Sequence, residues 1–280
     1  MELRARLVVE GFIAGLHRSP YHGFSVEFAE HRPYMPGDEI RHLDWKIYGR
    51  TDRFYIKQYE EETNLKAYLI VDSSSSMAYA SPGHLPKVQY AAYLAASLAY
   101  MMIKQQDAVG LALFDETINT FLPPHATRAY LKQILVSLDR VKAGNGTVAG
   151  RSLHLVAERI KRRGLVIILS DLFDNPDEII AALKHFRHKK NEVIVMHVLD
   201  PLERTFAFGK DATFRDMETR EQMVTQPWFI QHSYRAAMDA FIERYKRECR
   251  EHHIDYVLLD TQTPFDVALL QYLSKRQRIH

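Results

Sequence analysis

The chain has 280 residues, of which 46% are hydrophobic and 26% are charged, a composition that is ordinary for a globular protein and excludes extensive disorder. This length allows one large domain or a domain with a smaller appendage. The 37 basic and 35 acidic residues give a formal net charge of +2, so no strong overall field favours nucleic acid as a partner. The single cysteine cannot form a disulfide within the chain, which fits a reducing compartment.

The sequence gives no sign of a secretion signal or a membrane span. Its first 15 residues, MELRARLVVEGFIAG, mix charged residues with apolar ones, unlike a signal peptide. The longest charge-free apolar stretch, residues 90–103, has 14 residues, whereas a helix needs roughly 20 to cross a bilayer. We therefore expect a cytoplasmic protein without a transmembrane helix.

Residues 1–63 are predicted to form a β-rich N-terminal extension. The segment 24–63 contains two prolines, many aromatic residues and short alternating runs such as RFYIKQY. We expect Trp45 to pack this extension onto the rest of the protein, because large aromatic side chains are usually buried. The alternative is a partner-binding face formed by Asp38, Arg41, Asp44 and Trp45.

Residues 64–280 are predicted to form one α/β domain. Their apolar runs are continuous rather than alternating, which indicates strands buried on both faces, and helical patterns separate them. The fold class is therefore a doubly wound, mostly parallel, Rossmann-like α/β sheet. Strands are predicted at 67–71, 108–114, 117–122, 165–170, 192–199 and 255–259, and helices near 86–105, 127–139, 151–162, 229–251 and from about 176 and 264.

An insertion is predicted near residues 200–228. Its segment FAFGKDATFRD, residues 206–216, alternates apolar residues around a Gly-Lys-Asp sequence. This pattern predicts a loop or a small hairpin that turns at residues 209–211.

Two predicted strands are each followed by a carboxylate. Asp72 follows the run AYLIV, and Asp171 follows LVIILS. Ligands of a doubly wound sheet bind beyond the carboxyl ends of its strands, where the strand order reverses. With the common strand order these two strands are neighbours, and both carboxylates face one crevice. Between them in sequence, the loop AGNGTVAG (143–150) presents Thr147.

Asp72, Ser74 and Ser76, in DSSSSM, match the D-x-S-x-S element of von Willebrand factor A domains. Thr147 and Asp171 match the two remaining positions, so the set resembles a complete metal-ion-dependent adhesion site. The resemblance implies a von Willebrand factor A-like domain over residues 64–280 that binds Mg²⁺ or Mn²⁺. For DSSSSM alone, a helix-capping turn with serine hydroxyls bonded to backbone N–H groups is the alternative.

The chemistry of these side chains suits such an ion. Mg²⁺ prefers hard oxygen ligands in near-octahedral geometry. The hydroxyls of Ser74, Ser76 and Thr147 ligate without adding charge, so the ion stays electrophilic and can accept a carboxylate from a partner protein. Ser73 and Ser75 lie off this pattern and are expected to serve the turn itself.

The N-terminal segments RPYMPGDEIRHLDW (32–45) and GRTDRFYIKQYEEET (49–63) resemble the signature that precedes the A-type domain in domain of unknown function family 58. Members of that family typically sit beside MoxR-type AAA+ ATPases, which implies such an ATPase as partner and a role in complex assembly or chaperone-like work. Many relatives carry N-terminal membrane helices, which this sequence lacks, so membrane attachment is not carried over.

The sequence thus predicts a non-enzymatic, metal-dependent protein–protein interaction module in which a partner's Glu or Asp completes the metal shell. Two alternatives stay open. A metal-dependent hydrolase would use the same acidic crevice with a metal-activated water, although the sequence offers no clear general base beyond Asp72 and Asp171. A vestigial metal site would leave a scaffold that binds partners through another face. A P-loop ATPase is excluded because no G-x-x-x-x-G-K-[ST] motif occurs.

Overall fold

The computed structural model describes residues 25–35, 38, 43–62, 65–144, 146, 148–208, 212–215, 222–225 and 227–277. The chain divides into two compact units, one comprising residues 17–65 and the other comprising the remaining residues.

The smaller unit is an antiparallel pair of strands, β1 (Ser25–Pro33) and β2 (Tyr55–Glu62), with the short helix α2 (Trp45–Thr51) between them in sequence. Asp44 is the N-cap of α2, because its side-chain oxygen accepts hydrogen bonds from the N–H groups of Lys46 and Ile47 in the first turn. This aspartate therefore has a structural role at the helix end.

The prediction that Trp45 packs the extension onto the rest of the protein concerns a contact between the two units and stays a prediction. The side chain of Trp45 is 60% exposed and contacts only the edge of the Tyr48 ring among the aromatic contacts described for it. Tyr48 stacks on Phe54 with ring centroids 4.4 Å apart, and Leu43 and Ile56 are buried apolar side chains among those that the structure describes in this unit.

The larger unit is built on a six-stranded sheet with the order β10–β7–β6–β3–β4–β5. All neighbouring strands are parallel except β4 and the edge strand β5, which confirms the predicted mostly parallel α/β sheet. The strand order reverses at β3, so β3 and β6 are neighbours. The strands are β3 (Lys66–Asp72), β4 (Ala108–Phe114), β5 (Ile118–His125), β6 (Leu165–Ser170), β7 (Glu192–Leu199) and β10 (Asp255–Asp260).

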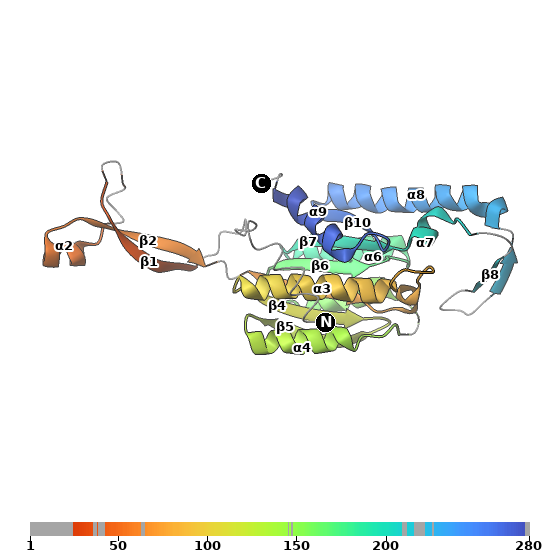
Figure 1. The fold of residues 1–280 in the computed structure, drawn as a ribbon, viewed down its shortest axis with the longest axis horizontal. Coiled ribbons are helices and arrows are strands. Elements are labelled where there is room, and N and C mark those ends of the chain that lie inside the picture. Colours follow the sequence, from red (N-terminus) through yellow and green to blue (C-terminus); the bar gives the residue numbers. More distant parts are fainter. Residues whose placement is uncertain are drawn as a thin grey trace. The chain divides into compact units, whose positions relative to one another are not determined.

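Helices cover both faces of this sheet, and its central strands are therefore apolar throughout (Figure 1). Successive side chains of β3 point to opposite faces, yet Leu69 and Ile70 are both fully buried. No helix in the described part of the chain is long and apolar enough to cross a membrane. One face carries α3 (Lys87–Lys104), α4 (Arg128–Asp139) and α9 (Phe265–Gln277), and the other carries α5 (Ala149–Arg159), α6 (Pro176–His188) and α8 (Pro227–Glu251).

The predicted insertion contains a short helix, α7 (Pro201–Thr205), and a hairpin of β8 (Ala212–Arg215) and β9 (Gln222–Thr225). The expected turn at residues 209–211 lies outside the described residues, and β8 pairs with the downstream strand β9. Phe206 ends α7 in a left-handed conformation and packs on Tyr234 of α8, with ring centroids 4.2 Å apart.

Candidate functional site

Aspartates line the carboxyl edge of the parallel strands. One ends or directly follows each of the five parallel strands, namely Asp72, Asp115, Asp171, Asp200 and Asp260. Asp200, after β7, caps α7, and Asp260, at the end of β10, pairs with Arg204 at 3.0 Å, so both have structural partners. The two at the reversal point, Asp72 and Asp171, are 1% and 0% exposed.

The serine turn after β3 brings three predicted ligands together. The backbone N–H of Ser74 donates to Oδ1 of Asp72 at 2.9 Å, and the hydroxyl oxygens of Ser74 and Ser76 lie 3.1 Å apart. The two off-pattern serines behave differently. Ser73 donates its hydroxyl to the carbonyl of Phe114 at 2.8 Å, whereas the buried hydroxyl of Ser75 has no hydrogen-bond partner. The pattern D-x-S-x-S therefore separates the converging hydroxyls from the others.

The end of β6 is bonded directly to this turn. Ser170 donates its hydroxyl to Oδ2 of Asp72 at 2.5 Å and accepts the N–H of Leu172 at 2.9 Å. Leu172 adopts a left-handed backbone, with φ of 57°, which turns the chain sharply beyond Asp171. The N–H of Phe173 then donates to Oδ1 of Asp171 at 3.2 Å. The structure thus places Asp171 at the same edge as Asp72, Ser74 and Ser76.

The electrostatics of the two carboxylates favour a bound cation. Burial, followed by the negative charge of Asp171, raises the pKa of Asp72 to about 7, although hydrogen bonds from Ser170 and Ser74 act in the opposite direction. Two buried like charges disfavour one another's ionisation. A cation between them would remove that penalty.

Thr147, the fifth predicted ligand, lies outside the described residues. The described residues near it are tied to the same edge of the sheet. Gly144 donates its N–H to the carbonyl of Ser73 at 2.6 Å, and Gly150 donates its N–H to the carboxylate of Asp174 at 3.2 Å. The loop that contains Thr147 therefore begins beside the serine turn and ends beside the loop after β6.

A lysine that sequence reasoning missed completes the charge distribution. Lys87, the first residue of α3, donates through Nζ to Oδ2 of Asp171 at 2.7 Å and to Oε1 of Glu203 at 2.6 Å. Burial alone would lower the pKa of Lys87, but the two carboxylates outweigh it and raise the pKa, so the side chain is an ammonium. A signal for this role is present in the sequence, because a cation in the first turn of a helix opposes the helix dipole and needs compensation.

The donor set fits a hard divalent ion. Asp72, Ser74, Ser76 and Asp171 offer oxygen atoms alone, as Mg²⁺ and Mn²⁺ require. The carboxylate oxygens accept the hydrogen bonds described above, and each carboxylate oxygen has two lone pairs, so lone pairs remain for an ion. When such an ion is bound, it supplies an electrophilic centre for an anionic group.

Comparison with known proteins identifies the family. The family described as "Protein of unknown function DUF58" matches residues 30–249. The chain belongs to the DUF58 family.

Curated relatives of this DUF58 chain include the uncharacterized proteins Rv1480 of Mycobacterium tuberculosis and Mb1516 of Mycobacterium bovis. Each is 24% identical over 222 residues, which are 78% of this chain and 69% of the relative. Solved structures that match include BatB from Bacteroides thetaiotaomicron, with 18% identity and a TM-score of 0.48 over 76% of this chain and 99% of that chain. An aerotolerance-related membrane protein from Bacteroides fragilis matches with 19% identity and a TM-score of 0.49 over 75% of this chain and 99% of that chain.

A histidine lies beside the site of the DUF58 chain, and both of its ring nitrogens have hydrogen-bond partners. His197 donates from Nε2 to the carbonyl of Asp171 at 2.8 Å, and its Nδ1 lies 2.6 Å from the hydroxyl of Tyr256. Burial lowers the pKa of His197 to about 4, so the ring is neutral. This histidine holds the backbone of the Asp171 loop in place.

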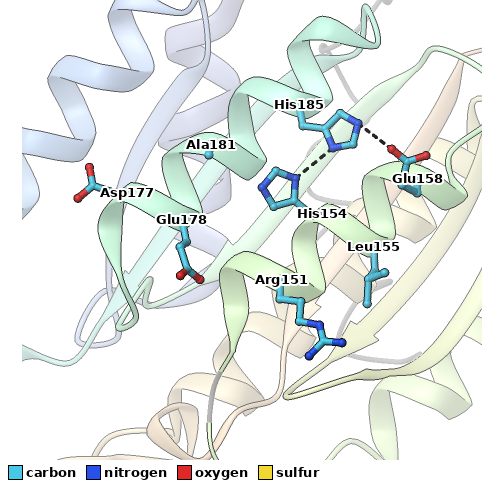
Figure 2. A pocket seen from close by; sticks show the side chains of 8 residues that line it. All are labelled: Arg151, His154, Leu155, Glu158, Asp177, Glu178, Ala181 and His185. Atoms are coloured by element: carbon cyan, nitrogen blue, oxygen red, sulfur yellow. Dashed lines mark hydrogen bonds and ion pairs between the residues drawn. The ribbon is translucent and has the colours of Figure 1, made fainter.

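A pocket lies between α5 and α6, and none of the predicted metal ligands lines it (Figure 2). Nδ1 of His154 lies 3.1 Å from Nδ1 of His185, whose Nε2 lies 3.0 Å from the carboxylate of Glu158. Burial, followed by the neighbouring His185, lowers the pKa of His154. The chain of three side chains joins the two helices.

The buried neutral state of His197 predicts a pH-dependent stability. Its pKa is near 6.5 in the unfolded chain and about 4 in the folded one, so the unfolded state binds the extra proton between these pH values. The free energy of unfolding of the metal-free protein should therefore fall by up to about 3 kcal/mol from this group as the pH drops from 6.5 to 4. Asp72, whose pKa is raised, acts in the opposite direction over this range.

The variant His197→Gln isolates the effect, because Asp72 contributes equally to both proteins. Urea unfolding at several pH values should show that the wild type loses stability relative to His197→Gln as the pH falls. Parallel pH profiles for the two proteins would contradict a buried neutral imidazole.

Proposed function

We propose that this DUF58 protein is a non-enzymatic, metal-dependent protein–protein interaction module with a von Willebrand factor A-like domain. Asp72, Ser74, Ser76 and Asp171 hold Mg²⁺ or Mn²⁺, and Thr147 from the neighbouring loop adds a further hydroxyl. One observation carries the proposal. Two buried carboxylates at the ends of adjacent parallel strands lie at the same edge of the sheet as a pair of serine hydroxyls 3.1 Å apart.

The partner contributes a Glu or Asp side chain to the ion. Ser74 and Ser76 contribute neutral hydroxyls, and one oxygen of Asp171 already pairs with Lys87. The site therefore carries no excess of negative charge over a divalent ion, and the proposed ligands leave part of the near-octahedral shell open to an additional anionic ligand. A metal-activated water for hydrolysis would need a general base, and the imidazole closest to Asp171 in the described part of the chain is the engaged His197.

The candidate partner is an AAA+ ATPase of the MoxR type. Two observations support it: membership of the DUF58 family and the resemblance of the N-terminal segments to proteins that sit beside such ATPases. The role would be that of an adaptor in complex assembly or chaperone-like work.

The serine turn offers a matched pair of variants for the metal site. Ser76→Ala removes a proposed ligand and should weaken Mn²⁺ binding by about tenfold or more, since each lost ligand is worth on the order of 1.4 kcal/mol or more. Ser75→Ala, one residue away, removes a buried hydroxyl without a partner and should leave the Mn²⁺ affinity unchanged. Isothermal titration calorimetry measures both affinities.

Equal Mn²⁺ affinities for Ser76→Ala and Ser75→Ala would contradict the assignment of Ser76 as a ligand. An Mn²⁺-dependent phosphatase or phosphodiesterase activity of the wild type, lost in Ser76→Ala, would favour the hydrolase alternative instead.

Partner binding should depend on the ion. A MoxR-type ATPase encoded beside this protein's gene should be retained by the immobilised wild-type protein in the presence of Mg²⁺ and released by excess EDTA. Asp72→Ala should abolish retention, because it removes a buried carboxylate of the metal site. Asp260→Ala, at the end of the distant edge strand β10, is the matched control and should retain the ATPase. Unchanged retention by Asp72→Ala and in EDTA would reject the metal-bridged mechanism and favour a scaffold that uses another face.

A further inference from the structure

Lys87 places a buried cation where the fold disfavours one. It is the first residue of α3, the end of the helix at which the helix dipole repels positive charge, and its side chain is 0% exposed. Removing an ammonium from water is unfavourable unless good partners surround it. The position is therefore stable only because of the groups that contact Nζ.

Three groups contact this ammonium. It bonds to Oδ2 of Asp171 at 2.7 Å and to Oε1 of Glu203 at 2.6 Å, and it lies 4.7 Å from the ring centroid of Phe173. Glu203 is fixed in turn, because its Oε2 accepts the backbone N–H of Asp200 at 3.0 Å. Lys87 is thus tied on one side to a proposed metal ligand and on the other to the capping box of α7.

We propose that Lys87 is a tethered cation that limits the affinity of the site for its divalent ion, an inference that rests on the proposed metal-binding function. Its ammonium occupies one oxygen of Asp171 and repels a second cation nearby. The site contains three carboxylates, those of Asp72, Asp171 and Glu203, and one ammonium, that of Lys87. When all are ionised the site carries two negative charges, which a divalent ion balances.

This charge balance has a consequence for the partner. Without Lys87, the site would carry three negative charges and would hold the ion more tightly. An incoming carboxylate would then meet a net negative site and would be repelled. With Lys87 present, the protein ligands and the lysine together leave the bound ion able to attract an acidic side chain. Lys87 is therefore a positioning residue that favours an acidic partner.

Variants that remove the charge of Lys87 or of Glu203 should change the Mn²⁺ affinity in opposite directions. Lys87→Met removes the positive charge and should tighten Mn²⁺ binding by about tenfold or more. Glu203→Gln removes a negative charge, leaves Lys87 paired with Asp171, and should weaken Mn²⁺ binding by about threefold or more. Lys104→Met, at an exposed position in the last turn of the same helix, is the matched control and should not change the affinity.

The affinities are measured by titrating Mn²⁺ alone into each full-length protein at pH 8, with circular dichroism as a check of folding. Opposite shifts for Lys87→Met and Glu203→Gln support the inference. A wild type that binds Mn²⁺, with folded Lys87→Met of equal or lower affinity, overturns the inference and leaves the metal site standing. If Lys87→Met does not fold, unchanged or tighter binding by Glu203→Gln overturns it. Absence of Mn²⁺ binding by the wild type and all three variants overturns both the inference and the proposed function.

Discussion

The structure depends on the burial of two carboxylates at the ends of adjacent strands. Parallel pairing of β3 with β6 brings Asp72 and Asp171 to one edge of the sheet, and helices on both faces exclude water from the strands that carry them. Buried like charges are costly, so other groups must compensate them. Backbone N–H groups, the hydroxyl of Ser170 and the ammonium of Lys87 provide part of this compensation. A divalent ion would provide the remainder.

The same compensation links the site to a second loop. Lys87 joins Asp171 to Glu203, and Glu203 forms a capping box with Asp200. Asp200 in turn accepts the backbone N–H and the hydroxyl of Ser81, both at 2.9 Å. The loops after β3, β6 and β7 are therefore connected by buried polar contacts rather than by apolar packing alone. Such fully paired networks hold their members in one geometry, which a metal site requires.

Much of the α/β fold was predictable from the sequence because its strands are buried on both faces. Continuous apolar runs at 108–114, 165–170 and 192–199 coincide with β4, β6 and β7. The positions of Asp72 and Asp171 followed from the rule that parallel strands present their carboxyl ends at one edge. The convergence of Ser74 and Ser76 followed from their spacing in a single turn.

Features that depend on distant contacts were not predictable. Lys87 contacts Asp171 and Glu203, which lie 84 and 116 positions further along the sequence. Its place in the first turn of a helix indicates that it needs anionic partners, but no local pattern specifies which residues they are. The pairing of β8 with β9 was not predictable either, because the alternation in residues 206–216 does not indicate the partner strand.

The central claim is that Asp72, Ser74, Ser76 and Asp171 share one divalent ion. It is tested most directly by a crystal structure of the protein with Mn²⁺, in which anomalous scattering locates the metal. We predict a single strong peak at the carboxyl ends of β3 and β6, within about 2.0–2.3 Å of the nearest serine and carboxylate oxygens or of waters bonded to them. Well-ordered crystals grown in millimolar Mn²⁺ with no peak there, or with Asp72 and Asp171 facing separate surfaces, would contradict the account.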